Sequence, residues 1–283
     1  MSGAAPLRQK GKNYLLKIRV ENLALDTIRP KEISQSYPLL FIHGAGGTSQ
    51  CWKNYLPYFA GEGWEVFAIN LRGHFPSDRE EALAQVTLED YLADVEQVIN
   101  RLGIRNCAVI GHSLGGLIAQ KTAENIESIR ALVTLASAPP LGIALEMNHD
   151  LAYSGTVLKT LWGMMNIRPV KPTFLIAEQT VLNNIFPAER QAVFNMFVAE
   201  SLFVGYQVAQ GVPVDPSRIK CPKLVVGCRQ DIIAPASLQE SLAVFLRADY
   251  IEYHQFAHLP MLENGWETSA KDIQNWLKST IRE

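Results

Sequence analysis

The chain has 283 residues, of which 48% are hydrophobic and 19% are charged, and its formal net charge is -2. These proportions are ordinary for a globular protein that buries a large core, and the length suits one α/β domain built around a single sheet. The near-neutral charge excludes the basic surface typical of proteins that bind nucleic acid or an anionic membrane, so a small neutral substrate is favoured.

Cysteine usage and the N-terminal residues indicate the compartment in which the protein works. The four cysteines form no CxxC pair and lie at no metal-ligand spacing with histidines, which predicts structural thiols in a reducing compartment. Residues 1–20 lack the uninterrupted apolar run of a signal peptide. The longest apolar stretches, such as Ala131–Leu145, contain prolines and are too short to span a bilayer. We therefore expect a soluble cytoplasmic protein with no membrane or nucleic-acid partner.

Short runs rich in Val, Ile, Leu and Phe recur along the chain, with helical patterns between them. Continuous apolar runs of this kind are typical of strands that helices cover on both faces of a parallel sheet. Because strand and helix alternate, the predicted class is α/β with right-handed crossovers. The predicted strands are, in chain order, 39–42, 66–69, 108–110, 132–135, 224–226 and 250–255.

Two helices are predicted with particular clarity. Apolar residues from Leu88 to Leu102 recur at helical spacing and form one stripe. Thr87 can cap this helix, with Asp90 three residues on as a capping-box variant, and Gly103 ends it. Near the C-terminus, a second stripe consists of Ala270, Ile273 and Leu277.

One segment breaks the alternation and is predicted to be an inserted helical cap. Residues 137–211 contain no good strand candidate, but they hold four of the six Met and five of the eleven Phe residues. This enrichment favours an apolar cap over a plain linker, although the same side chains could instead pack a small core of the segment's own. The core domain would then consist of residues 1–136 and 212–283.

The expected cap offers two apolar faces to a substrate. The run 188–206 is predicted to place Phe194, Phe197, Val198 and Phe203 on one helical face. A second face would consist of Trp162, Met164 and Met165. Neither face shows an evident charged partner, because the nearby charged residues are predicted to fall elsewhere on the helix (Glu189, Arg190 and Glu200).

The clearest chemical motif is the sequence GHSLG at residues 111–115. It follows a predicted strand and opens a helical run, which is the strand–turn–helix context that a nucleophile elbow requires. Glycine is needed at 111 and 115 because side chains there would collide with backbone in so tight a turn. The N-terminus of the following helix favours developing negative charge. Ser113 is therefore the predicted nucleophile.

A serine hydroxyl is a weak nucleophile and needs a base to take its proton. Four of the six histidines lie in the glycine motifs, after the second long strand or in the expected cap (His43, His112, His74 and His149). His254 lies within the predicted strand 250–255 and is interpreted as a pairing-strand or core histidine. His258 follows that strand in a loop, from which a base can reach the carboxyl edge of the sheet. His258 is therefore the predicted base.

The base needs a carboxylate to fix its tautomer and to stabilise the imidazolium. Asp231 follows the predicted strand 224–226 and its short extension, at the edge of the sheet where open α/β folds place their sites. It also precedes His258, which gives the chain order Ser, acid, His. The alternative is a helix-capping or turn aspartate. We predict that Asp231 orients His258.

A glycine-rich turn at His43–Gly47 is predicted to complete the site as an oxyanion hole. The strand 39–42 runs directly into it, and glycines let backbone N–H groups approach a substrate closely. The expected donors are the N–H groups of Ala45 and of Leu114, the residue after the nucleophile. A phosphate-binding loop is the competing interpretation, but no Gly-Lys-Ser/Thr follows and GxGxxG is absent.

Together these motifs resemble those of the α/β-hydrolase superfamily, in its esterase and lipase-like branch with an inserted helical cap. The resemblance extends from about Tyr37 to the last helix. It rests on His43–Gly47, Asn70–His74 with Ser77, the elbow at Ser113, Gly227–Asp231 with Pro235, and His258.

The resemblance implies a Ser113–Asp231–His258 triad without a metal or an organic cofactor. An aspartate in place of the elbow serine would have indicated dehalogenase or epoxide hydrolase chemistry, and Ser113 argues against both. Two positions depart from the family pattern without removing a catalytic group. Asn70 stands where the family often has Asp, and Ala257 stands where Gly often precedes the catalytic His.

The leading functional prediction is hydrolysis of a carboxylic ester with apolar small to medium groups, through a Ser113 acyl-enzyme. Thioesters and lactones use the same machinery. The same fold and triad also support C–C bond hydrolysis, lyase or perhydrolase chemistry, since a fold does not determine a function. A non-catalytic ligand receptor is disfavoured because the predicted triad and both oxyanion loops are intact.

Overall fold

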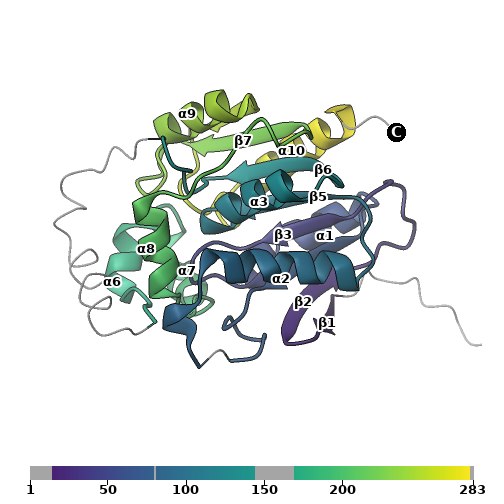
Figure 1. Ribbon diagram of the computed structural model, residues 1–283. Coiled ribbons are helices and arrows are strands. Elements are labelled where there is room, and N and C mark those ends of the chain that lie inside the picture. The colour runs from purple at the N-terminus through teal and green to yellow at the C-terminus, as the bar shows by residue number, and fades with distance from the viewer. Residues whose placement is uncertain (1–14, 80, 144–168, 281–283) are drawn as a thin grey trace, which may run out of the picture.

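The computed structural model describes residues 15–79, 81–143 and 169–280. At its centre lies an eight-stranded sheet with the order β1-β2-β4-β3-β5-β6-β7-β8 (Figure 1). Strands β3 to β8 are parallel, as predicted, whereas β1 and β2 run antiparallel to their neighbours. The strands are β1 Leu16–Val20, β2 Leu23–Ile28, β3 Leu39–Ile42, β4 Val66–Asn70, β5 Cys107–His112, β6 Ile129–Leu135, β7 Lys223–Cys228 and β8 Asp249–Tyr253.

The first two strands are absent from the sequence prediction. β2 is wholly buried, yet it carries Asp26, which interrupts its apolar run. The Asp26 carboxylate accepts a hydrogen bond from the Ser49 hydroxyl at 2.7 Å, which offsets part of the cost of burial, while its other oxygen has no partner among the described residues. This tertiary contact of a polar residue in a buried strand cannot be read from residue patterning alone.

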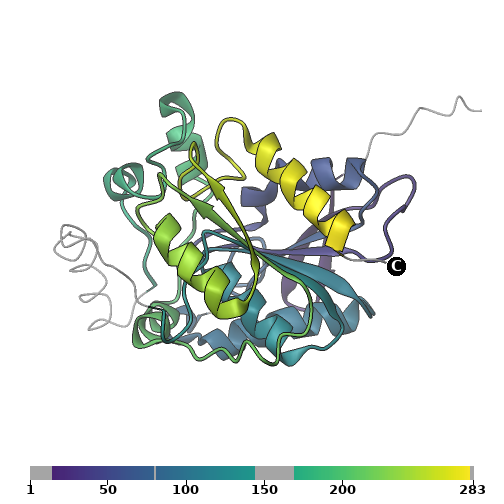
Figure 2. The same cartoon turned by 90° about the horizontal axis from the view of Figure 1, so that it is seen from above.

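Helices cover both faces of the sheet, as Figure 2 shows from above. One face is covered by α1 (Tyr55–Gly61) and α10 (Trp266–Thr280), and the other by α2 (Leu88–Arg101), α3 (Leu114–Asn125) and α9 (Ala236–Leu246). Two short 3-10 helices, η1 (Ser49–Trp52) and η2 (Leu83–Gln85), lie in the loops. Within the described residues, no helix has the length and apolar character needed to cross a membrane.

Alternate strand residues enter two separate cores. On β3, Leu40 and Ile42 pack with the α2, α3 and α9 side, while Leu39 and Phe41 pack with the α1 and α10 side. Successive side chains of a strand point to opposite faces, so a strand buried on both faces must be apolar throughout. The continuous apolar runs in the sequence have this origin.

Three helices of the segment 169–211 lie together at one end of the sheet (Figure 1). They are α6 (Phe174–Gln179), α7 (Pro187–Phe194) and α8 (Leu202–Gln210). The continuous helix predicted over 188–206 is wrong, because α7 stops at Phe194 and α8 begins only at Leu202. The predicted second face of Trp162, Met164 and Met165, together with Met147 and His149, lies outside the described residues.

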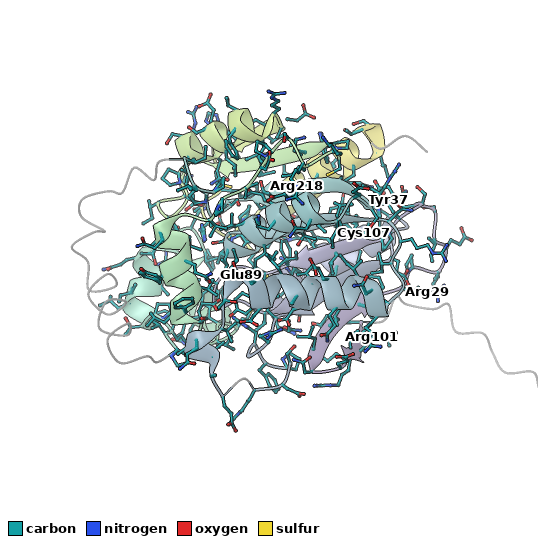
Figure 3. The ribbon with its side chains drawn as sticks, in the orientation of Figure 1. Arg29, Tyr37, Glu89, Arg101, Cys107 and Arg218 are labelled. Carbon is teal, nitrogen blue, oxygen red and sulfur yellow. The ribbon has the colours of Figure 1, made fainter. Side chains whose placement is uncertain are left out.

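Helix α8 is tied to the start of α2 by one side chain. The Gln207 amide oxygen accepts from the Leu88 N–H at 2.8 Å, and its amide nitrogen donates to the Glu89 carboxylate at 2.9 Å. Glu89 lies on α2 next to α8 in Figure 3. These contacts attach the segment 169–211 to the helical layer of the core.

The predicted cap of α2 leads to a stability prediction. The Thr87 hydroxyl accepts from the Asp90 N–H at 3.1 Å, and the Asp90 carboxylate accepts from the Thr87 N–H at 2.9 Å. Thr87→Val keeps the shape but leaves a helical N–H without its acceptor, so chemical denaturation should show a loss of about 1 kcal/mol. The exposed Asn100→Ala on the same helix should stay within about 0.5 kcal/mol of wild type. Equal stability of the two variants would contradict this cap.

Candidate active site

The turn between β5 and α3 holds Ser113 in a backbone conformation that residues other than glycine rarely adopt. Its φ is 51° and its ψ is -120°. Three hydrogen bonds hold this strained residue in place: its N–H donates to Leu135 O at 3.0 Å, and its carbonyl accepts from the N–H groups of Gly116 and Ala138 at 2.9 Å each. Strain of this kind persists only where the surroundings enforce it, and it projects the serine side chain out of the turn.

The two glycines of the elbow are required by close backbone contacts, as the motif predicted. A Cβ at Gly111 would lie 2.1 Å from the carbonyl oxygen of Gly115. A Cβ at Gly115 would lie 2.3 Å from the carbonyl oxygens of both Ile42 and His43. Real Cβ atoms do not approach backbone this closely, so glycine alone lets α3 pack against the end of β3.

The structure brings the three predicted site residues into one hydrogen-bonded chain. His258 Nε2 lies 3.2 Å from Ser113 Oγ, and His258 Nδ1 lies 2.8 Å from Asp231 Oδ2. The three side chains come from the loops that follow β5, β7 and β8. Because these strands are parallel, their carboxyl ends meet at one edge of the sheet, where residues far apart in sequence become neighbours.

The Asp231 carboxylate fixes the tautomer of the histidine. Burial raises the pKa of Asp231, but His258 and the N–H groups of Ile233 and Ala234 outweigh it and hold that pKa below its usual range. A charged carboxylate only accepts hydrogen bonds, so the proton of the imidazole lies on Nδ1. Nε2 is then left as an acceptor that faces the serine hydroxyl.

A second buried carboxylate, which the sequence analysis missed, fixes the loop of the histidine. Glu263 accepts hydrogen bonds from the N–H groups of Ala257 and Leu259, at 2.8 and 2.9 Å, on either side of His258. Burial raises the pKa of Glu263. Asn184, from the segment 169–211, donates to the same carboxylate at 2.5 Å. A buried acid five residues after the base is the signal that could have identified it.

Asn184 also contacts the loop of the histidine directly, because the same amide nitrogen lies 2.8 Å from the carbonyl oxygen of Gln255. Its neighbour Asn183 donates to the carbonyl oxygen of Gln230 at 3.0 Å, next to Asp231. The segment 169–211 is therefore bonded to the loops that carry His258 and Asp231.

The glycine-rich turn His43–Gly47 lies directly against the elbow. A Cβ at Gly44 would lie 2.8 Å from His112 Nδ1 and 2.9 Å from Ser113 Cβ, so glycine is needed for this approach. Among the described residues, no partner accepts a hydrogen bond from the N–H of Ala45 or of Leu114, the two predicted oxyanion donors. Both N–H groups belong to backbone beside Ser113, and an oxygen of a substrate can accept from them.

Two further histidines, which lie in the two glycine motifs, shape the site. His43 Nδ1 donates to Gly44 O at 2.8 Å, while its Nε2 accepts from the Leu71 N–H at 3.2 Å, which defines a neutral ring. Burial lowers the pKa of His43 to about 3. His112 Nε2 donates to the carbonyl oxygen of His258 at 2.7 Å, and burial likewise lowers the pKa of His112 to about 3. Both rings are therefore structural.

His254 does not have the place that the sequence suggested. β8 ends at Tyr253, and His254 follows it as an exposed residue, 3.6 Å from the Glu252 carboxylate. The interpretation as a strand or core histidine is wrong, because β8 ends at Tyr253, two residues before the predicted end of the strand at residue 255.

An apolar cavity of about 160 Å³ opens onto Ser113. The segment 169–211 contributes Pro172, Val181, Phe197 and Val198 to its wall, and no described lining residue is an Asp, Glu, Lys or Arg. The remaining wall comes from the elbow, the glycine-rich turn and the loops of the triad, with Cys51, Ile233 and Leu259.

The predicted apolar face of the segment is only partly correct. Phe197 and Val198 reach the cavity from the stretch between α7 and α8, but Phe194 packs against the rings of Phe174 and Phe197 instead. Phe203 is 43% exposed on α8. The absence of a charged partner is also wrong, because Lys171 Nζ lies 4.6 Å from the centroid of the Phe194 ring.

The departure from the family pattern at Asn70 is satisfied locally. The Asn70 side chain is fully buried, accepting from the Ser49 N–H at 2.8 Å and donating to Ala24 O at 3.0 Å. An amide can do both, whereas a charged carboxylate cannot donate.

Among residues 15–79, 81–143 and 169–280, no group of three or more His, Cys, Asp or Glu side chains is arranged to hold a metal ion.

Comparison with known proteins bears on the fold. The family model described as "alpha/beta hydrolase fold" matches residues 37–164. Epoxide hydrolase 3 of Mus musculus is 21% identical, and the match covers 76% of this chain and 63% of that protein, so the chain spans less than two thirds of this relative. Strigolactone esterase D14 of Arabidopsis thaliana is 26% identical over 80% of this chain and 86% of its own length.

A solved structure shows the same architecture. The esterase EaEST from Exiguobacterium antarcticum superposes with a TM-score of 0.72 at 18% identity, covering 90% of this chain and 95% of that one. The matched family model, this likeness, and the mostly parallel sheet with helices on both faces agree. The chain has the alpha/beta hydrolase fold.

Proposed function

We propose that the protein is a serine hydrolase that cleaves carboxylic esters carrying small to medium apolar groups. One observation carries the proposal: Ser113, His258 and Asp231 form a continuous hydrogen-bonded chain at the mouth of a cavity whose described wall is mostly apolar. Nucleophile, base and orienting acid are recognised by such geometry and roles rather than by their order in the sequence.

The proposed reaction proceeds by acyl transfer. Ser113 Oγ attacks the ester carbonyl while His258 Nε2 accepts its proton, and Asp231 stabilises the imidazolium that forms. The negative charge on the carbonyl oxygen is stabilised by the N–H groups of Ala45 and Leu114. The alcohol leaves with the proton from His258. Water, activated by the same histidine, then hydrolyses the acyl-enzyme.

The elbow residue favours ester over epoxide hydrolysis. One relative is named an epoxide hydrolase and another an esterase. In the α/β-hydrolase superfamily, which the motifs resemble, an aspartate at the elbow indicates epoxide opening. The chain has Ser113 at this position. A serine with a neighbouring histidine is suited to acyl transfer.

We further propose that residues 137–211 act as a cap over the site, within a core domain of residues 1–136 and 212–283. Support comes from Pro172, Val181, Phe197 and Val198, which form part of the cavity wall. All four cysteines are buried and free, which supports a reducing, cytoplasmic location. The proposed partner is a small-molecule ester-like substrate.

Ser113→Ala should abolish ester hydrolysis while leaving the fold intact, because alanine fits the turn but supplies no nucleophile. Loss of a triad serine costs on the order of a million-fold in kcat. Steady-state hydrolysis of a nitrophenyl ester measures the effect, with the exposed Ser241→Ala on α9 as the matched control. More than about a tenth of wild-type activity in Ser113→Ala would refute the assignment.

The rate of hydrolysis should rise with pH on the acid side. Asp231 keeps its charge well below neutral pH because its pKa is lowered, so protonation of Asp231 does not limit the rate there. The limiting event is protonation of the base, because only a neutral imidazole can accept the serine proton. We expect kcat/KM to increase between about pH 5 and pH 8 in a buffered series. A flat profile over this range would argue against His258 as base.

The cavity predicts a preference for apolar acyl groups. Each methylene transferred from water into an apolar wall contributes roughly 0.8 kcal/mol, or about fourfold in kcat/KM. In a series of nitrophenyl esters, kcat/KM should therefore climb from acetate over the first few added carbons. A charged acyl group should react slowly because no described side chain of the wall offers it a counter-charge. Faster turnover of charged acyl groups would contradict an apolar acyl site.

A further inference from the structure

The side chain of Glu200 is the meeting point of a buried polar cluster below the glycine-rich turn. It lies between α7 and α8, and only 14% of the side chain is exposed. Its carboxylate accepts four hydrogen bonds, from the N–H groups of Gly46 (2.8 Å) and Ser201 (2.6 Å), the Tyr91 hydroxyl (2.5 Å) and His74 Nε2 (3.3 Å). A carboxylate with this many donors is fully satisfied without water.

The partner of this carboxylate is a charged histidine. His74 is fully buried, and its Nδ1 lies 3.0 Å from the carbonyl oxygen of Arg72. Both ring nitrogens therefore face oxygens that only accept, so both must carry protons. Burial lowers the pKa of His74, but Glu200 outweighs this and raises it above its ordinary value. Burial also raises the pKa of Glu200, but His74 lowers it to about 2.

Two contacts fix Gly46, one with Glu200 and one with the backbone of Val198. Its N–H donates to Glu200, and its carbonyl oxygen accepts from the Val198 N–H at 2.8 Å. Gly46 has a φ of +61°, and a Cβ there would lie 2.9 Å from Val198 O, so no other residue fits without strain. The peptide that follows Ala45 is thereby held to residues 198–200.

The other end of the turn contacts the same cluster. The ring of His43 lies 4.8 Å from the ring of His74, centroid to centroid, and its Nδ1 donates to the carbonyl oxygen of Gly44. Ala45 therefore lies between Gly44 and Gly46. Glu200 holds the N–H of Gly46 directly, and His43, whose ring lies against that of His74, holds the carbonyl oxygen of Gly44. An N–H donor helps a transition state only if its direction is set beforehand.

We propose that Glu200 is a positioning residue of the oxyanion hole: it orients the Ala45 N–H by holding Gly46. This inference rests on the proposed function, because it assigns the Ala45 N–H to the developing oxyanion of an ester. It gives the segment 169–211 a second role, beyond forming the wall of the cavity. The segment supports the chemistry as well as the fit of the substrate.

Glu200→Gln tests the proposal. A glutamine keeps the size of the side chain but has only one acceptor oxygen, and its NH₂ group faces other donors. The N–H of Gly46 is then no longer held by a carboxylate. Displacement of an oxyanion donor by a fraction of an ångström should lower kcat by about ten- to a hundredfold, with KM changed less than about threefold. The matched control is Glu189→Gln, an exposed acid on α7 without an ion pair among the described residues.

The outcome of this measurement separates the two proposals. A loss in kcat of more than about fivefold relative to Glu189→Gln, at similar KM, supports the role of Glu200. If Ser113→Ala is inactive but Glu200→Gln retains its kcat, or loses rate only through a higher KM, the inference about Glu200 is wrong and ester hydrolysis stands. If wild type cleaves no ester and a fluorophosphonate does not label Ser113, the proposed function and the positioning role of Glu200 are both refuted.

Amide hydrogen exchange in the wild-type protein tests whether Glu200 holds the Gly46 N–H. It needs neither a substrate nor a variant whose stability could change. The Gly46 N–H should exchange slowly, because its acceptor is a buried carboxylate. The Gly47 N–H, which donates within the turn to Gly44 O at 3.0 Å, is the internal reference. Exchange of Gly46 at the rate of an unprotected loop amide would overturn the proposal.

Discussion

The close approach of three backbone segments at the elbow is the constraint on which the site depends. The end of β5, the start of α3 and the end of β3 lie so near one another that Gly111 and Gly115 have no room for a Cβ. This packing imposes the positive φ of Ser113 and exposes its hydroxyl. It also brings the glycine-rich turn against the nucleophile, so the serine and the proposed oxyanion donors are positioned by one set of contacts.

Buried carboxylates then fix the groups that must act around this rigid centre. Asp231 sets the tautomer of His258, and Glu263 holds the backbone on either side of it. Glu200, paired with His74, holds Gly46 in the same manner. Burial of an unpaired carboxylate is costly, and each of these three is stabilised by several N–H or O–H donors. Fully satisfied polar networks of this kind are rigid, as pre-organised sites require.

The sequence predicts the parallel strands and the three residues at their carboxyl ends because these depend on local patterns. An apolar run, a glycine-flanked serine and a loop histidine each have a local physical cause. The contact of Glu200 with Gly46 does not, since it spans 154 positions of sequence and nothing near either residue marks the pair. β2 eluded prediction for the same reason: the partner that allows Asp26 to be buried belongs to η1. The break between Phe194 and Leu202 likewise follows from contacts with Gly46 rather than from helical periodicity.

The hydrogen bonds of Asn184 have a consequence for how such an enzyme can diversify. This residue joins the substrate-facing segment to the carboxylate and the carbonyl that hold the loop of the histidine. An insertion that merely covered the opening could be exchanged for another by recombination, and each exchange would alter only the range of accepted molecules. Here an exchanged segment would have to reproduce an amide donor at this point, or the machinery beneath it would lose rate. If the protein acts as proposed, selectivity and reactivity are inherited as a unit, and new specificities are more accessible through single replacements in the cavity wall than through substitution of the whole segment.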